Sequence, residues 1–147
     1  MLASRLLHSL PEKRTMQSEQ LSNLHPGWVV GGWALAAAVT SGVYLGGVGM
    51  GLVPPGTGAV VWVAISMGVG FFVGGFFVGL RWSEAPVLHA GAITLFSLIV
   101  WFMAAFFDPT SPFDSLSVAL GVILLQWVAA SAGGWAGRRS ATGRTLG

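Results

Sequence analysis

The chain alternates between long apolar stretches and short polar connections. No Asp, Glu, Lys or Arg occurs between Glu19 and Arg81, and the intervals 85–107 and 115–137 are also free of these residues. A bilayer-spanning helix needs about 20 apolar residues. The first interval is therefore long enough for two spans and each of the others for one, so the pattern predicts an all-α integral membrane protein with four transmembrane helices.

Prolines, glycines and polar residues divide these intervals into spans. Pro54-Pro55-Gly56 ends the first span, because two prolines followed by glycine cannot continue a helix, and Pro86 suits the first turn of the third. Short links between spans predict two antiparallel hairpins, preceded by an N-terminal segment (1–27) and followed by a tail (138–147). The expected spans of the 28–137 transmembrane domain are about 28–53, 59–80, 86–107 and 116–137.

The basic residues fall on one side of this arrangement. All seven Lys and Arg residues precede the first span, follow the second or follow the fourth. Lys and Arg in short connections are retained on the cytoplasmic side of a membrane. The opposite side carries Asp108 and Asp114. We therefore expect both termini in the cytoplasm and the 108–114 loop outside.

The composition narrows the chemistry that the chain can perform. Of 147 residues, 54% are hydrophobic and 8% are charged, whereas soluble chains carry roughly 25% charged residues. The absence of Cys excludes disulfides, thiolate metal sites and cysteine nucleophiles. Membrane topology explains the net charge of +2 better than nucleic acid binding does. No Ser, His and acidic residue form a plausible triad, so we expect no enzyme.

Glycines at a spacing of four residues predict how the helices pack. Residues four apart share a helix face, and in lipid, helices associate through close backbone contact at small residues. Replacing Gly74 or Gly75 by Leu should therefore separate the helices, whereas Val78→Leu should have a mild effect on stability. Gly47 and Gly51 form a further pair at this spacing. The glycines expected at helix contacts are Gly42, Gly46, Gly70, Gly74, Gly75, Gly79, Gly133 and Gly137.

His89 and Gln126 are the polar residues of greatest interest within the spans. A neutral imidazole at His89, about one turn inside the third span, could ligate a metal or the magnesium of a chlorin pigment, or bond a quinone carbonyl. The alternative is that His89 caps or wets the helix start. Gln126, near the middle of the fourth span, is expected to hydrogen-bond to another helix rather than to a ligand. No Asp, Glu, Lys or Arg lies at depth, which disfavours a proton relay.

The third span is rich in bulky residues and offers chiefly Gly91 as a small one. Its aromatic residues would face lipid or a partner. Taken with the lack of catalytic groups, this favours a non-catalytic accessory subunit of a larger membrane complex. The host would be a bioenergetic complex, either respiratory or photosynthetic, in which the subunit contacts a pigment, quinone or lipid. The alternative is a homo-oligomeric small-solute transporter or channel lined by Thr and Ser. The expected partner face consists of Trp101, Phe102, Phe106 and Phe107.

The two expected hairpins share a sequence pattern. Each begins with His-x-Gly, at 25–27 and 89–91, and ends with a Gly-Gly pair, an aromatic residue, Gly and Arg, at 74–81 and 133–138. Either the chain contains a parallel internal repeat, related by an axis along the membrane normal, or the matches are coincidences in a Gly-rich chain.

The run GGFFVGLRWSEAPVLHAGAITLFSLIVWFM, followed later by AGGWAGRR, resembles small four-span bacterial membrane proteins of unknown function. In that family the second span ends Gly-Gly-x-x-x-Gly-Arg and the third opens with His/Tyr-x-Gly. The likeness covers about residues 28–139, and the chain departs from it by inserting Leu80 before Arg81. The resemblance implies the four-span topology and a bacterial inner membrane, and it implies no activity. The matching residues are Gly74, Gly75, Gly79, His89, Gly91, Gly133 and Gly134.

Overall fold

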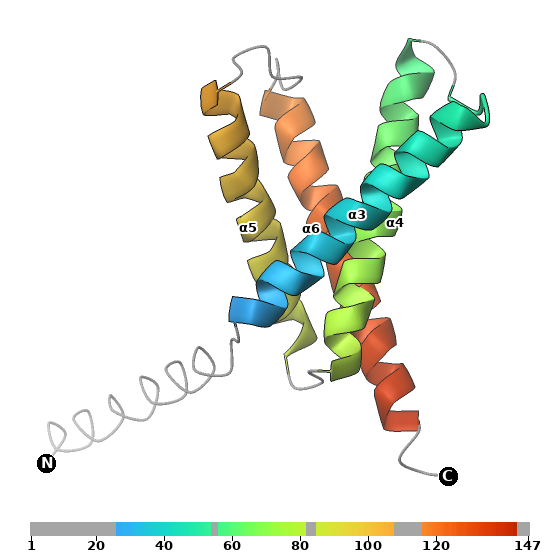
Figure 1. Ribbon diagram of the computed structural model, residues 1–147. Helices are drawn as coiled ribbons and strands as arrows, with labels where there is room; N and C mark the ends of the chain where they lie inside the picture. Colours follow the sequence, from blue (N-terminus) through green and yellow to red (C-terminus); the bar gives the residue numbers. More distant parts are fainter. Residues whose placement is uncertain (1–25, 54–55, 82–84, 108–115, 144–147) are drawn as a thin grey trace, which may run out of the picture.

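The computed structural model of the protein describes residues 26–53, 56–81, 85–107 and 116–143. Over these ranges the fold is all-helical (Figure 1). The N-terminal segment up to residue 25, the 108–114 loop and the last four residues, 144–147, lie outside the described part of the chain. The helices are α3 (Pro26–Gly49), α4 (Thr57–Arg81), α5 (Pro86–Phe107) and α6 (Leu116–Gly143).

Three of these helices differ from the expected spans at their ends, most clearly α3 and α6. α3 begins at Pro26 and stops at Gly49, short of the expected end at residue 53. α6 continues beyond residue 137 to Gly143, because arginine is a good helix former and the Arg pair does not interrupt the helix. α5 has the expected bounds, and α4 is longer than the second span by a few residues.

A glycine, rather than the proline pair, ends α3. Gly51 has a φ of 71°, in the left-handed region that favours glycine. Its amide donates to the Val48 carbonyl at 3.0 Å, and the Leu52 amide donates to the Gly47 carbonyl at 2.9 Å. This pair of bonds is the Schellman motif, which satisfies the last carbonyls of a helix. The helix is therefore closed before the chain reaches Pro54.

The helices have the length and composition of membrane spans. Three of them, over Pro26–Gly49, Gly58–Arg81 and Ser117–Gly143, are long and apolar enough to cross a membrane, and α5 contributes a shorter apolar stretch over Val87–Met103. Large apolar side chains are exposed on all four helices. An exterior of this kind is typical of a protein surrounded by lipid.

α4 is the central helix of the bundle. It packs most extensively against α6 and next against α3, whereas α5 packs mainly on α6 and is the least embedded of the four. In Figure 1, the ends of α3 and α5 and the starts of α4 and α6 lie at the upper end of the view. The start of α3 and the end of α6 both lie at the lower end.

Small residues bring α3 against α4. A Cβ placed on Gly74 would lie 2.6 Å from the Gly32 carbonyl oxygen and 2.9 Å from the Ala36 Cβ. A Cβ on Gly70 would lie 2.5 Å from the Ala36 carbonyl oxygen and would also meet Thr40. Residue numbers fall along α4 as they rise along α3, so these two helices run in opposite directions.

A second face of α4 contacts α6, and the contact is reciprocal. A Cβ on Gly75 would collide with the Ala130 carbonyl group, and a Cβ on Gly133 would collide with the Phe72 carbonyl group. Each glycine therefore lies directly on the backbone of the other helix. Gly133 follows Gly75 by 58 residues, and Ala130 follows Phe72 by the same 58.

The next turn repeats this arrangement. A Cβ on Gly79 would meet the backbone of Gly134, and a Cβ on Gly137 would meet the Phe76 carbonyl. These residues are again related by an offset of 58. Residue numbers rise together along both helices, so α4 and α6 run in the same direction and meet at equivalent backbone positions. The counterpart of Gly133 in this contact is Gly75, because the adjacent Gly74 faces α3.

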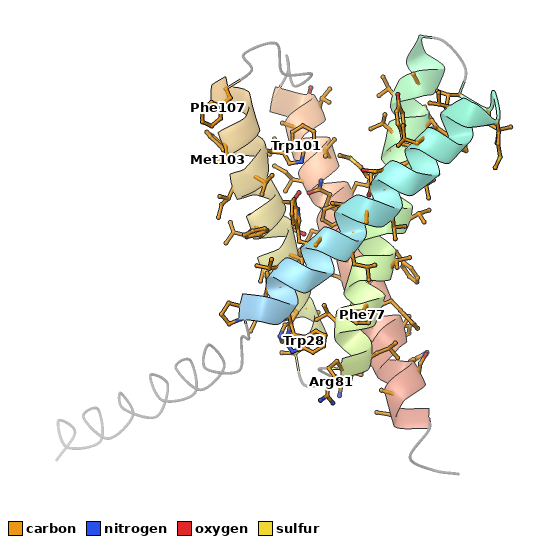
Figure 2. The ribbon with its side chains drawn as sticks, viewed as in Figure 1. Trp28, Phe77, Arg81, Trp101, Met103 and Phe107 are labelled. Carbon is orange, nitrogen blue, oxygen red and sulfur yellow. The ribbon has the colours of Figure 1, made fainter. Side chains whose placement is uncertain are left out.

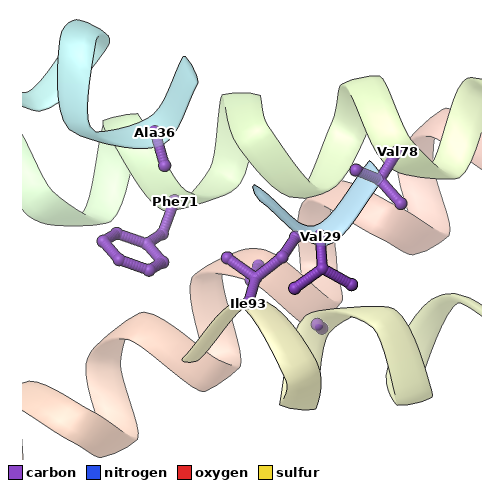
Figure 3. Close-up of a cluster of buried hydrophobic side chains, with 7 residues drawn as sticks. Val29, Ala36, Phe71, Val78 and Ile93 are labelled. Carbon is purple, nitrogen blue, oxygen red and sulfur yellow. The ribbon is translucent and has the colours of Figure 1, made fainter. Parts of the chain in front are cut away.

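A small cluster of buried hydrophobic side chains lies where the helices meet, and every helix contributes to it (Figure 3). Val78 belongs to it with 2% of its surface exposed, and its Cγ2 would lie 2.7 Å from a Cβ on Gly32. The expectation that Val78→Leu is mild is therefore wrong, because the position has no space for a larger side chain. The cluster consists of Val29, Ala36, Phe71, Val78, Ala90, Ile93 and Ala130.

Candidate functional site

A cavity of about 300 Å³ is lined by side chains from all four helices. Its volume is at the small end of the range of about 300–1,000 Å³ typical of small-molecule sites. Aromatic side chains from α3, α4 and α5 form part of its wall, namely Trp33, Phe71 and Trp101. In Figure 2, Trp101 lies on the side of α5 nearer α6, whereas Met103 and Phe107 lie on the outer side.

Gln126 is the larger of two buried polar residues that line this cavity, the other being Ser97. Its side chain is 2% exposed, and α6 places it in the cavity wall. The amide nitrogen Nε2 has no hydrogen-bond partner among the described residues. The interhelical hydrogen bond expected from the sequence is therefore not made by Nε2, which leaves a buried donor without an acceptor on a residue that lines the cavity.

Two other buried hydroxyl groups are satisfied within their own helices. The Ser66 hydroxyl donates to the Trp62 carbonyl at 2.8 Å, and the Thr94 hydroxyl donates to the Ala90 carbonyl at 3.0 Å. Such bonds to the preceding turn are the usual way for Ser and Thr to be accommodated inside a helix. These hydroxyl groups therefore differ from the Gln126 amide nitrogen, which makes no such bond to its own helix.

A second cavity of about 200 Å³ adjoins the first. The two share Thr40 and Ser41, and the second is also lined by Tyr44, Val63 and Ser66. In the described part of the chain, the Thr40 Oγ1 has no hydrogen-bond partner. A row of hydroxyl groups thus extends from the Gln126 cavity along α3.

His89 is buried, with 3% of its surface exposed. Its Nδ1 lies 3.0 Å from the Ala85 carbonyl oxygen, which also accepts the His89 backbone amide at 3.2 Å. Nδ1–H is therefore the donor, and Nε2 is left as an acceptor without a partner among the described groups. His89 lines neither cavity described above, nor a third of about 310 Å³ near the start of α3. An Nδ1–H bond to a backbone carbonyl fixes the ring and leaves Nε2 as the atom that a ligand would use, so both roles expected for His89 stay open.

Six of the eight glycines expected at contacts lie against a neighbouring helix, whereas Gly42 and Gly46 do not. A Cβ on either would meet no described atom within 4 Å. At about 100° per residue, Gly42 lies about 120° and Gly46 about 80° around α3 from Ala36, which faces α4. Gly47 shares the face of Ala36 and lies under the Trp62 ring. The six at contacts are Gly70, Gly74, Gly75, Gly79, Gly133 and Gly137.

The residues expected to form the partner face separate into two groups. Phe102 and Phe107 are 75% and 78% exposed. Trp101 is half-buried and lines the cavity, so it does not belong to the outer face. The side chain of Phe106 lies outside the described part of the structure. Trp101 follows Ser97 by one helical turn and shares its side of α5, whereas Phe102 is about 100° further around.

The fold and cavity together define an all-helical protein with membrane-type helices and an uncharged cavity that opens to the exterior between them. No protein-family model, curated protein or solved structure matches the chain. Its function is therefore inferred from its own residues.

Proposed function

We propose that the protein is a non-catalytic subunit of a larger membrane complex, and that its four helices cross the bilayer as two antiparallel hairpins. The helices contain 22 to 28 residues. At about 1.5 Å per residue these lengths correspond to roughly 33–42 Å, enough for a hydrocarbon core of about 30 Å. The lipid bilayer is then the main environment of the exposed side chains.

The ends of the helices support an orientation with both termini in the cytoplasm, in a bacterial inner membrane. Arg81 is the last residue of α4 and lies at the lower end of Figure 2, near Trp28. Close to the end of α6, the Arg139 guanidinium lies 3.6 Å from the centre of the Trp135 ring. Paired indole and basic groups are typical of a headgroup layer, and basic residues favour the cytoplasmic side.

The observation that carries the subunit proposal is the outer face of α5. This helix contributes least to the packing of the bundle, yet it exposes Phe102, Met103 and Phe107 at 75%, 56% and 78%. Aromatic side chains supply much of the contact energy at protein interfaces. We infer that this face binds a larger subunit, with a respiratory or photosynthetic complex as the host that best suits a small span-only chain.

Site-specific photo-cross-linking tests this proposal. Benzoylphenylalanine would replace Phe102 in cells of the native host, with the same group at Val60 as the matched control, since Val60 is 65% exposed on α4. We expect the Phe102 position, and not the Val60 position, to capture one larger membrane subunit in constant ratio. Capture of lipid alone, or of a second copy from both positions, would contradict the proposal.

A homo-oligomeric transporter or channel for a small solute is the second candidate. The observation that favours it is the row of hydroxyls along α3, where Thr40 and Ser41 join the two cavities. If this candidate is correct, the purified chain alone will pass a neutral polyol across liposomes, and Thr40→Val will slow the flux. Flux without any other subunit would replace the subunit proposal.

A further inference from the structure

We propose that the 300 Å³ cavity binds a neutral, lipid-soluble molecule that combines a flat ring with a carbonyl group, as a quinone does. The carbonyl oxygen would accept a hydrogen bond from the Gln126 Nε2. The inference concerns the isolated chain and does not depend on a partner subunit.

The unpaired donor is the first reason. The Gln126 side chain is 2% exposed and lines the cavity, and its Nε2 has no hydrogen-bond partner within the described residues. A buried amide donor without an acceptor is unfavourable in an apolar interior. An occupant that offers an acceptor removes this penalty, whereas a hydrocarbon chain does not.

The aromatic wall is the second reason. Trp33, Phe71 and Trp101 come from three different helices and line the same cavity. Trp33 is held in place by an edge-on contact with Phe96, at 5.2 Å between ring centres and 74° between planes. Aromatic side chains favour stacked or edge-on contacts with another ring. The wall therefore suits a flat ring better than a flexible acyl chain.

The lack of charge is the third reason. The polar groups of the wall are the amide of Gln126 and the hydroxyls of Thr40, Ser41 and Ser97, and none of the described lining residues is Asp, Glu, Lys or Arg. An ion placed here would lose its hydration without gaining a counter-charge. The expected ligand is therefore neutral and reaches the cavity from the membrane.

Water is the competing occupant, since a cavity of this size can hold ordered water molecules that bond to Gln126 and the neighbouring hydroxyls. The two occupants differ in what they require. Water needs polar partners and gains nothing from the aromatic wall, whereas a ring carbonyl compound uses both. Probes that carry either the ring or the carbonyl group, but not both, therefore distinguish a ring carbonyl compound from water as the occupant.

Titration of the purified full chain in lipid nanodiscs with 2-decyl-1,4-benzoquinone tests the proposal, with calorimetry as the readout. Decylbenzene has the ring without a carbonyl, and methyl decanoate has a carbonyl without the ring. We expect saturable binding of the benzoquinone and markedly weaker binding of the other two. Equal heats for all three probes, or partitioning into lipid without saturation, would overturn the assignment and leave water as the occupant.

Variants locate the bound probe. Gln126→Leu keeps a similar volume and removes the donor, and we expect affinity for the benzoquinone to fall about three- to tenfold. Val128→Leu is the matched control on an exposed part of α6 and should bind as the unmodified chain does. Unchanged affinity after Gln126→Leu would overturn the role of its amide.

A second variant keeps the test decisive if Gln126→Leu fails to fold. Ala37 lines the cavity, and Ala37→Leu fills part of it while leaving Gln126 in place. We expect this variant to lose the saturable binding of the benzoquinone. Wild-type affinity in Ala37→Leu would show that the probe binds elsewhere on the protein and would refute the proposal.

Discussion

The α4–α6 contact and the cavity wall show two different ways of packing helices in one chain. At the contact, Gly75 and Gly133 each lie on the carbonyl group of the opposite helix, so backbone touches backbone. At the cavity, large side chains such as Trp33 and Trp101 surround a space of about 300 Å³. Close packing of glycines holds the bundle together on one side, and this leaves room for an open site on the other.

The contrast has a physical basis in the solvent that we propose. Helices in lipid gain little from burying apolar surface, so they associate where small residues allow many short-range contacts. The four predictions below test this contrast by changing side-chain volume at positions that are packed less and less closely.

The largest effect is expected at the α4–α6 contact. Gly75→Leu places a side chain where the Ala130 carbonyl lies, and the backbone of α6 has to move away. We expect the free energy of unfolding, measured by SDS titration in mixed micelles, to fall by about 3 kcal/mol or more. Gly42→Leu is the control, since a Cβ there meets no described atom within 4 Å; equal losses for both would refute the glycine contact.

A smaller effect is expected where the obstructing group is a side chain. Gly47 lies under the Trp62 ring, and a ring can rotate away more easily than a helix backbone can shift. Gly47→Ala should therefore lower the unfolding free energy by about 1–3 kcal/mol. In a Trp62→Leu background the same substitution should have almost no effect, and a double-mutant cycle measures this coupling. Additive losses would show that the ring does not cause the penalty.

Filling the cavity should change stability less again. Ala37→Leu adds side-chain atoms to the wall of a space that is already open. We expect the unfolding free energy to stay within about 1 kcal/mol of the parent value, with a gain if the new atoms find contacts. A loss as large as the one expected for Gly75→Leu would mean that the cavity is closed in the purified protein.

The smallest effect is expected on the outer face of α5. Phe102 is 75% exposed, so Phe102→Ala should alter the unfolding free energy of the isolated chain by less than about 0.5 kcal/mol. A thermal scan of the purified chain checks this value. A loss above about 2 kcal/mol would assign Phe102 to the bundle core rather than to a partner surface.

The positions of the four helices could be predicted from the sequence, because gaps between charged residues and proline-containing links mark them directly. The end of α3 could not be placed as well. Two prolines at 54–55 are the stronger helix breakers, but Gly51 comes first and its left-handed backbone closes the helix. The choice between two adjacent stop signals depends on hydrogen bonds at the helix end that the residue types alone do not determine.

The glycine spacing predicted the packing of α4 and α6, but it did not identify the residues of α3 that contact α4. On α3 the contact runs along Gly32, Ala36 and Thr40, a row of small residues four apart that contains a single glycine. A search for small residues in general would have found this row, whereas a search for glycine pairs selected Gly42 and Gly46 instead. Which small face is used depends on the neighbouring helix, and sequence spacing does not identify that neighbour.

The cavity could not be predicted from the sequence. Gln126 could be recognised as a buried polar residue, but its unpaired Nε2 follows from the distances between four helices. Trp101 was assigned to the outer face because bulky aromatic residues surround it in the sequence. A rotation of about 100° per residue separates it from Phe102, and the facing direction of the helix is set by tertiary packing.

The offset of 58 residues between the two halves of the α4–α6 contact also has a consequence for synthesis. Gly75 is translated 58 residues before Gly133, which at about 5–20 residues per second is a delay of roughly 3–12 s. During that time the Gly75 face of α4 is complete and its partner helix does not yet exist. In the proposed bilayer, lipid covers this face of α4 until α6 is made, so lipid has to leave it before the two backbones can meet.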